Sequence, residues 1–277
     1  MPSSKMYHQE FEPPEELRNV IKCFWHNKTD FGETESSFDI MPDSYAEIIF
    51  HFGNGCSILQ DGTFEPLPSP FIMGLLNKPA IISSKNCLEI VGIRCYPWTV
   101  FDLFKLSSGK EEVHILKHPI AKLQSLLSEY IISNNIDEAI ALLKKYFLDT
   151  QLKTNSDNRL SKAGDAMRKT NGNIPVSQVA IEAHTTVRTL ERNFKQSSGH
   201  TVKDVSALMR FEQARNQLWH NPETNLAGLA HELGYTDQSH LSREFKRYSG
   251  TTPSAFARKG KKEKQALSSD FVVFVQS

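Results

Sequence analysis

Residues 228–256 read GLAHELGYTDQSHLSREFKRYSGTTPSAF, and this stretch decides the fold of the C-terminal half. Its apolar residues fall at helical spacing and stop at Gly234, where a Tyr-Thr-Asp turn follows. They resume on a short polar stretch that contains Arg243, Lys246 and Arg247. Two helices joined by a three- to four-residue turn form a helix-turn-helix. The stretch therefore predicts one such motif, with a basic second helix.

A near copy of this stretch occurs earlier in the chain. Residues 176–205 read VSQVAIEAHTTVRTLERNFKQSSGHTVKDV and keep the apolar skeleton, with a turn one residue shorter. Both copies have an Arg between a Leu and a Phe, and a Gly after the second helix. Two copies are too few for a solenoid, so they indicate a duplicated supersecondary unit. The predicted helices span 176–183 and 187–197 in the first copy, and 226–233 and 237–248 in the second.

Capping and core residues follow from residue type and position. Thr186 and Thr236 are suited to be N-caps, because a hydroxyl oxygen can accept a hydrogen bond from the free backbone N–H groups of the first turn. Gly199 and Gly250 are placed to end the second helices. The predicted inward faces of these helices carry Val187, Leu190 and Phe194 in the first copy, and Leu241, Phe245 and Tyr248 in the second.

The outward faces of the second helices carry side chains that can contact DNA. Arg can bond a guanine edge twice and Gln can do so for adenine, while Lys and helix N-termini suit phosphate. A solvated surface is the ordinary alternative, but the same kind of face occurs on both copies. The candidate DNA-binding residues are Arg188, Glu191, Arg192 and Lys195 in the first copy, and Gln238, Ser239, His240, Ser242, Arg243, Lys246 and Arg247 in the second.

A helical pattern over 203–221 lies between the two copies. A stiff helix here would fix the spacing of the two motifs. Two reading helices on one face of B-DNA must lie about 34 Å apart to enter successive major-groove segments. The sequence therefore predicts a two-pronged reader of double-stranded DNA.

The N-terminal half has a different pattern. Between 38 and 96, short β-favouring runs alternate with turn signals such as GNG and QDG, which predicts a small barrel or sandwich. A helix-like pattern begins at Pro97, and amphipathic helices are expected at 119–132 and 136–148. The predicted fold class is therefore two-domain α+β, with a β-rich N-terminal domain that carries helices and an all-α C-terminal domain. The predicted boundaries are 1–150 for the β-rich domain, 151–158 for a linker, 159–258 for the DNA-binding domain and 259–277 for a basic stretch with an apolar tail.

Charge and cysteine usage narrow the class of protein. The formal net charge is zero, yet residues 158–264 hold 18 Lys and Arg against 10 Asp and Glu, so the remainder is acidic. A basic half joined to an acidic half favours a polyanion as the partner of one half. The 4 Cys form no CxxC pair and no His cluster has ligand spacing, so neither a metal nor another cofactor is predicted. We expect a cytoplasmic protein without a membrane partner, because the sequence shows no signal peptide and no long apolar run.

Residues 159–258 resemble the DNA-binding domain of AraC/XylS-type transcription regulators. The stretch LAHELGYTDQSHLSREFKRYSGTTPSAFAR carries this resemblance most specifically, and RFEQARNQL resembles the connecting helix of the family. The resemblance implies seven helices with two helix-turn-helix units, whose second helices contact bases. His184 departs from the family, which usually has Gly at this turn. Glu191 suits a cytosine contact but repels phosphate.

The N-terminal half resembles a β-rich domain that precedes this module in some relatives, through MPDSYAEIIFHFG, Gly74 and IVGIRCYPWTVFDLF. The family places sensing or dimerisation in this half, in a cupin-like barrel in its best-known members. The implied partners are a small-molecule effector, a second copy of the chain and, for an activator, RNA polymerase. Five aromatic residues fit either a ligand pocket or ordinary core: Trp25, Phe50, Phe52, Tyr96 and Trp98.

Three functions are compatible with these features. The first is a sequence-specific transcription regulator, the second an enzyme or repair protein that uses the same DNA reader, and the third a partner-binding protein whose helices never contact DNA. The second needs chemistry such as clustered cysteines, GxSxG, a P-loop, GxGxxG or HExxH, and the sequence has none of these patterns. The third predicts DNA affinity that changes little with salt. The sequence favours the first function, without catalysis.

Overall fold

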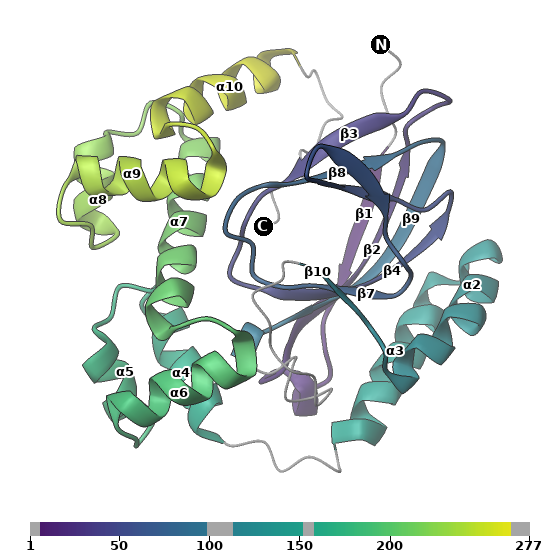
Figure 1. Cartoon of the computed structure of the whole chain (residues 1–277), viewed down its shortest axis with the longest axis horizontal. Helices are drawn as coiled ribbons and strands as arrows, with labels where there is room; N and C mark the ends of the chain where they lie inside the picture. The colour runs from purple at the N-terminus through teal and green to yellow at the C-terminus, as the bar shows by residue number, and fades with distance from the viewer. Residues whose placement is uncertain (1–5, 99–112, 152–157, 267–277) are drawn as a thin grey trace.

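The computed structural model describes residues 6–98, 113–151 and 158–266 (Figure 1). A β-rich N-terminal half lies beside an all-helical C-terminal half, which confirms the predicted α+β class. Most of the helix-like pattern that begins at Pro97 and all of the apolar tail at 270–277 lie outside the described residues. The four predicted domain boundaries stay predictions.

The larger sheet is antiparallel and has six strands in the order β1-β2-β9-β4-β7-β10. Its central strand β9 pairs with β2 on one side and with β4 on the other, so Gly92 lies opposite Trp25 in one pair and Ile49 in the other. The strands are β1 (Met6–Phe11), β2 (Ile21–Asp30), β4 (Ala46–Gly53), β7 (Phe71–Met73), β9 (Cys87–Cys95) and β10 (Val113–Ile115).

A second antiparallel sheet has four strands in the order β3-β8-β5-β6. Apolar side chains from one face of the larger sheet, such as Trp25, Ile49 and Phe71, share one core with Ile58 and Ile82 of the smaller sheet. This packing follows from the period of two, which sends alternate residues of each strand to the same face. The strands are β3 (Ser36–Ile40), β5 (Ser57–Gln60), β6 (Thr63–Pro66) and β8 (Ala80–Ser84).

Helices cover the other face of the larger sheet. Phe24 and Phe50 point to this face and pack with Leu143 and Phe147 of the helix that follows the sheets. Both helices predicted in this region are confirmed, although the first begins as a 3-10 turn. The elements are η1 (Glu15–Leu17), η2 (Pro119–Leu123), α2 (Gln124–Ile132) and α3 (Ile136–Gln151).

The long strand β2 was missed by the sequence interpretation because its inward side chains are partly polar. His26 is buried, and its Nε2 lies 2.8 Å from Oε1 of Glu89, whose other oxygen pairs with Lys28 at 2.9 Å. Burial lowers the pKa of His26 and outweighs the hydrogen bond to Glu89, which acts in the opposite direction. A hydrogen-bonded polar pair across two strands therefore replaces the apolar alternation that sequence patterns detect.

The described residues 158–266 of the C-terminal half form seven helices, the number that the resemblance implied. Its apolar core is continuous with three residues of the N-terminal half: Leu75, Tyr96 and Trp98. Trp98 packs where Gly164 has no side chain, since a Cβ there would lie 2.0 Å from the indole. The helices are α4 (Asn158–Lys169), α5 (Val176–Glu182), α6 (Val187–Ser198), α7 (Val202–His220), α8 (Leu226–Glu232), α9 (Gln238–Ser249) and α10 (Pro253–Ala266).

Candidate nucleic-acid interface

The first helix-turn-helix consists of α5 and α6. Thr186 caps α6, as predicted, by accepting a hydrogen bond from the Thr189 N–H at 3.2 Å. The turn before it places His184 at φ 49°, in the left-handed region that glycine adopts without steric cost. The helix ends at Gly199 with φ 75°, which is also as predicted. The first unit therefore forms the motif with one strained residue in its turn.

The second helix-turn-helix consists of α8 and α9, and its turn contains Gly234 at φ 73°. The prediction of Thr236 as the N-cap is wrong. The N-cap is Asp237, whose carboxylate accepts a hydrogen bond from the His240 N–H at 2.7 Å. The turn is one residue longer here than in the first unit, which moves the cap position by one. Gly250 ends the helix with φ 73°, as predicted.

Helix α7 connects the two units. It begins with a capping box, in which Thr201 and Asp204 exchange hydrogen bonds. Burial raises the pKa of Asp204, but the hydrogen bonds from the Thr201 hydroxyl and N–H outweigh it, and the pKa lies below its ordinary value. The helix has 19 residues and so rises about 28 Å. In Figure 1, α6 and α9 lie across its two ends.

Aromatic packing and one arginine hold the second unit on α7. The ring of Phe211 lies 5.1 Å from that of Phe245 and 5.2 Å from that of Tyr248, and all three side chains are fully buried. Arg210 pairs with Glu244 of α9 at 3.4 Å and also donates to the Gly172 carbonyl at 3.1 Å. These contacts fix the orientation of α9, so its remaining faces point outward.

The structure brings the candidate DNA-binding residues onto the outer faces of α6 and α9. None of them is buried. Glu191, His240 and Ser242 are half-buried. The exposed members are Arg188, Arg192 and Lys195 on α6, and Gln238, Ser239, Arg243, Lys246 and Arg247 on α9.

Some of these side chains also have contacts within the protein, among them Glu191, Arg247 and His240. The Glu191 carboxylate accepts a hydrogen bond from the Val202 N–H at 3.3 Å, at the start of α7. The Arg247 guanidinium lies 5.1 Å from the Tyr248 ring centroid, and the His240 ring packs edge-on against Tyr235. The contact of Glu191 joins α6 to α7, which is a structural use of a side chain that suits DNA contact poorly.

The predicted inward residue Val187 does not face the core. Its side chain is 42% exposed, whereas Leu190 and Phe194 are buried as predicted. Val187 is the first residue of α6, between the exposed Thr186 and Arg188, where the turn leaves its side chain uncovered. The inward face of α6 therefore begins one turn later than the periodicity indicates.

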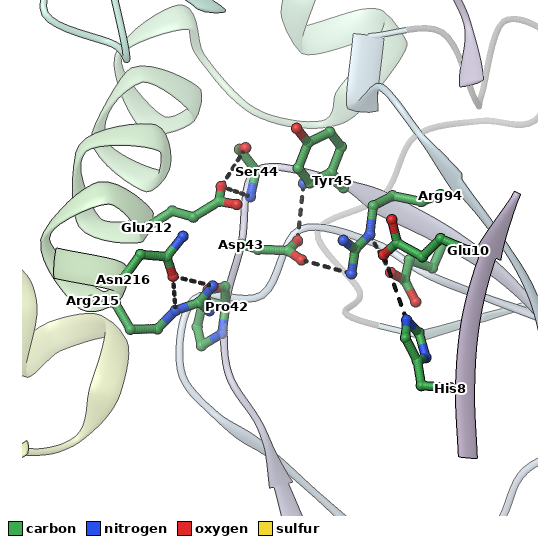
Figure 2. Close-up of polar contacts among 11 residues, drawn as sticks. His8, Glu10, Pro42, Asp43, Ser44, Tyr45, Arg94, Glu212, Arg215 and Asn216 are labelled. Carbon is green, nitrogen blue, oxygen red and sulfur yellow. Dashed lines mark hydrogen bonds and ion pairs between the residues drawn. The ribbon is translucent and has the colours of Figure 1, made fainter. Parts of the chain in front are cut away.

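The connecting helix also contacts the N-terminal half, through residues that the sequence interpretation did not single out (Figure 2). Ser44 donates to the Glu212 carboxylate from its hydroxyl at 2.7 Å and from its N–H at 3.3 Å. Arg215 donates to the Pro42 carbonyl at 3.1 Å. Burial raises the pKa of Glu212 and lowers that of Arg215. We call these bonds between 42–44 and α7 the interdomain contact.

A signal for this contact was present in the sequence. Phe211, Ala214, Arg215 and Leu218 follow the i, i+3, i+4, i+7 pattern of a buried helix face, and Arg215 occupies one of its four positions. An arginine on an apolar stripe is rarely fully buried unless it is paired. Arg215 is 1% exposed, so this position marks a polar contact inside an interface.

The described residues contain neither a metal-site arrangement nor a membrane-spanning helix. Among residues 6–98, 113–151 and 158–266, no group of three or more His, Cys, Asp and Glu side chains is arranged to hold a metal ion. No helix in the same ranges is long and apolar enough to cross a membrane. The 4 Cys are free thiols.

Two helix-turn-helix units joined by one connecting helix define a DNA-binding protein of the double helix-turn-helix class. Comparison with known families agrees with this class. Residues 159–259 match a helix-turn-helix domain family, and residues 9–111 match a domain of unknown function (DUF6597). The C-terminal region of the chain therefore contains a helix-turn-helix domain of the AraC type.

Individual relatives match over less than a third of the chain. The HTH-type transcriptional regulator RipA of Corynebacterium diphtheriae is 33% identical over 82 residues, which are 30% of this chain and 24% of that protein. RipA of Corynebacterium glutamicum is 31% identical over 87 residues, 30% of this chain and 26% of that protein. The matches thus span about a quarter of the curated relatives. Among solved structures, ToxT from Vibrio cholerae is 12% identical with a TM-score of 0.44, over 85% of this chain and 98% of that one.

Proposed function

We propose that this protein is a sequence-specific regulator of transcription that acts by binding double-stranded DNA and not by catalysis. The observation that carries the proposal is the pair of outward basic faces on α6 and α9, fixed at the two ends of α7. Arg192 and Arg243 occupy the same position in the two units, between the buried Leu and Phe of each second helix. They are our principal candidates for base contacts.

The two units are proposed to enter adjacent major-groove segments on one face of the duplex. Arg188, Gln238 and Ser239 lie in the first turns of α6 and α9, where a reading helix meets base edges. Lys195, Lys246 and Arg247 lie toward the C-terminal ends and are assigned to phosphate. The helical rise of α7, about 28 Å, is close to one turn of B-DNA, about 34 Å. A single protein molecule can therefore read two half-sites.

The N-terminal half is proposed to bind a small-molecule effector, to mediate homodimerisation, or both. The interdomain contact supports a role in control, because it joins this half to the helix that spaces the two units. Trp98 makes a second contact between the two halves, because its ring centroid lies 5.9 Å from that of Phe194 on the inner face of α6. Contact with RNA polymerase is proposed for the case of an activator, and the protein is proposed to act in the cytoplasm, where the chromosome of a bacterial relative lies.

Selection of binding sites from random duplex DNA by the full-length protein, at near-physiological salt, tests this function. We expect an enriched site with two short boxes about 10 base pairs apart. A doubled or inverted site would add dimerisation. Lys122→Ala, an exposed change far from the helical half, is the matched control and should select the same site. No enrichment by the wild type, together with DNA affinity that is flat in salt, would favour the partner-binding function.

A further inference from the structure

A cavity lies between the two sheets of the N-terminal half. Its volume is about 40 Å³, and apolar side chains from both sheets line most of its wall, including Ile49, Phe71 and Ile82. Burial raises the pKa of the Cys56 thiol, which also lines the cavity, to about 12, so this group stays uncharged. Two further lining residues, Trp25 and Glu47, give the cavity its polar chemistry.

Trp25 offers a hydrogen-bond donor that no described group uses. Its side chain is 3% exposed, and its Nε1 has no partner within the described part of the chain. The indole lies flat across the central strand β9 because Gly92 has no side chain, since a Cβ there would lie 2.4 Å from Nε1. A buried N–H without an acceptor is unfavourable, because it has lost its hydrogen bond to water and gained none in the protein. Such a cost is expected where a ligand supplies the missing acceptor.

Glu47 sets the charge of the cavity. It is 7% exposed and accepts a hydrogen bond from Nε of Arg94 at 2.8 Å. The same guanidinium lies 3.7 Å from a carboxylate oxygen of Asp43 (Figure 2). One arginine thus balances two carboxylates, and no Lys, Arg or His is among the described residues that line the cavity. An anionic ligand would therefore meet the Glu47 carboxylate, and no cationic side chain among the described lining residues would attract it.

We propose that this cavity binds a small, uncharged, largely apolar molecule that carries one hydroxyl group. The hydroxyl oxygen accepts a hydrogen bond from Nε1 of Trp25, and the hydroxyl O–H donates a hydrogen bond to the Glu47 carboxylate. A carboxylate can accept several hydrogen bonds, so this bond does not require loss of the one from Arg94. The inference names the chemical class of the effector and, in its link to DNA, rests on the proposed function.

The segment after β3 connects this cavity to the helical half. Met41 lines the cavity, and Pro42 and Ser44, which follow it closely in the chain, make the interdomain contact with α7. A cavity that admits benzene measures about 150 Å³, so a one-ring ligand must displace part of this wall. Met41 is half-buried and has an unbranched, flexible side chain. We therefore expect it to change conformation most easily among the residues that line this side of the cavity. Occupancy of the cavity would therefore shift residues 42–44 against α7.

Calorimetric titration of the full-length protein with three one-ring probes of similar size tests the class of ligand without DNA. We expect phenol to bind about five- to tenfold more tightly than toluene, as one hydrogen bond implies. Benzoate, the anion, should not bind measurably. Trp25→Phe leaves a smaller aromatic ring without the N–H, so it should abolish the preference for phenol over toluene. Met41→Ala enlarges the cavity and should tighten both neutral probes.

The indole N–H resonances give a second readout that does not depend on the stability of a variant. The chain has 3 Trp, and the signal missing from Trp25→Phe identifies Trp25. Phenol should move this signal more than toluene does. Equal affinity for phenol and toluene, tightest binding of benzoate, or no binding of any probe would each overturn the proposal. Since DNA is absent from both measurements, a failure of the DNA-binding function would not affect their outcome.

Discussion

The two helix-turn-helix units share the same pattern of apolar residues, but they differ in their turn residues and in the elements that hold their second helices. In the first, a non-glycine residue, His184, adopts the left-handed turn, and Phe194 on the inner face of α6 contacts Trp98 of the N-terminal half. In the second, Gly234 makes the same turn without strain, and α9 is held by α7 through Phe211 and Arg210. The difference indicates that the first unit is the one more directly exposed to events in the N-terminal half.

The largest expected effect concerns the aromatic anchor of the second unit. Phe245→Ala should destabilise the fold by about 3–5 kcal/mol, because the ring is fully buried and packs on Phe211. Urea unfolding measures this change. Val187→Ala in the first unit is the control and should cost less than about 0.5 kcal/mol, since that side chain is exposed. Equal losses in the two variants would contradict the burial assigned to Phe245.

The next effect concerns the interdomain contact. Arg215→Met introduces an unbranched apolar side chain and leaves Glu212 buried without its nearby cation, which should cost about 3 kcal/mol. The loss should be partly recovered in the double variant with Glu212→Gln, because this removes the uncompensated carboxylate. A double-mutant cycle by chemical unfolding gives the coupling energy. Strictly additive losses would show that the two side chains do not act together.

The sequence predicted the helical half more completely than the β half, and the reasons are physical. Because the helix-turn-helix unit occurs twice, each of its helices and its C-terminal glycine could be recognised in two copies of the sequence. Strand β2 has no such copy, and its buried polar residue His26, which bonds Glu89, interrupts the apolar alternation typical of a strand. The prediction of Thr236 as the N-cap of α9 was wrong because Asp237, one residue later, is an equally good N-cap.

The aromatic residues divide into three environments that one-dimensional patterns cannot separate. Trp25 lines the cavity between the sheets, Phe50 and Phe52 pack with the helices on the opposite face, and Tyr96 and Trp98 join the core of the helical half. The ordinary-core interpretation is therefore confirmed for Phe50, Phe52, Tyr96 and Trp98, and the ligand-pocket interpretation stays a prediction for Trp25. The environment of each aromatic side chain depends on which face of the sheet it packs against, and the pairing between distant strands determines this face.

A smaller effect distinguishes base contacts from phosphate contacts within the second unit. Arg243→Ala should cost about 1–3 kcal/mol on the selected site and relax the sequence preference there. Lys246→Ala should weaken binding to all sequences about equally and lower the dependence on salt. Fluorescence anisotropy on selected and scrambled duplexes, over a range of salt, separates the two. Equal losses on both duplexes for Arg243→Ala would remove this residue from the set that contacts bases. Arg192→Ala extends the same comparison to the first unit.

The smallest effect tests the difference between the turns. His184→Gly should stabilise the protein by up to about 1 kcal/mol, because glycine adopts φ 49° without steric cost. Gly234→Ala should act in the opposite direction by at least about 1 kcal/mol, since φ is 73° and the new Cβ would lie 2.0 Å from the Asn173 side chain. Thermal unfolding of both variants measures these changes. If His184→Gly instead destabilises the chain, the imidazole makes a contribution that offsets its backbone strain. If it stabilises the chain but weakens DNA binding, the strain in the first turn serves to position α6 for its site.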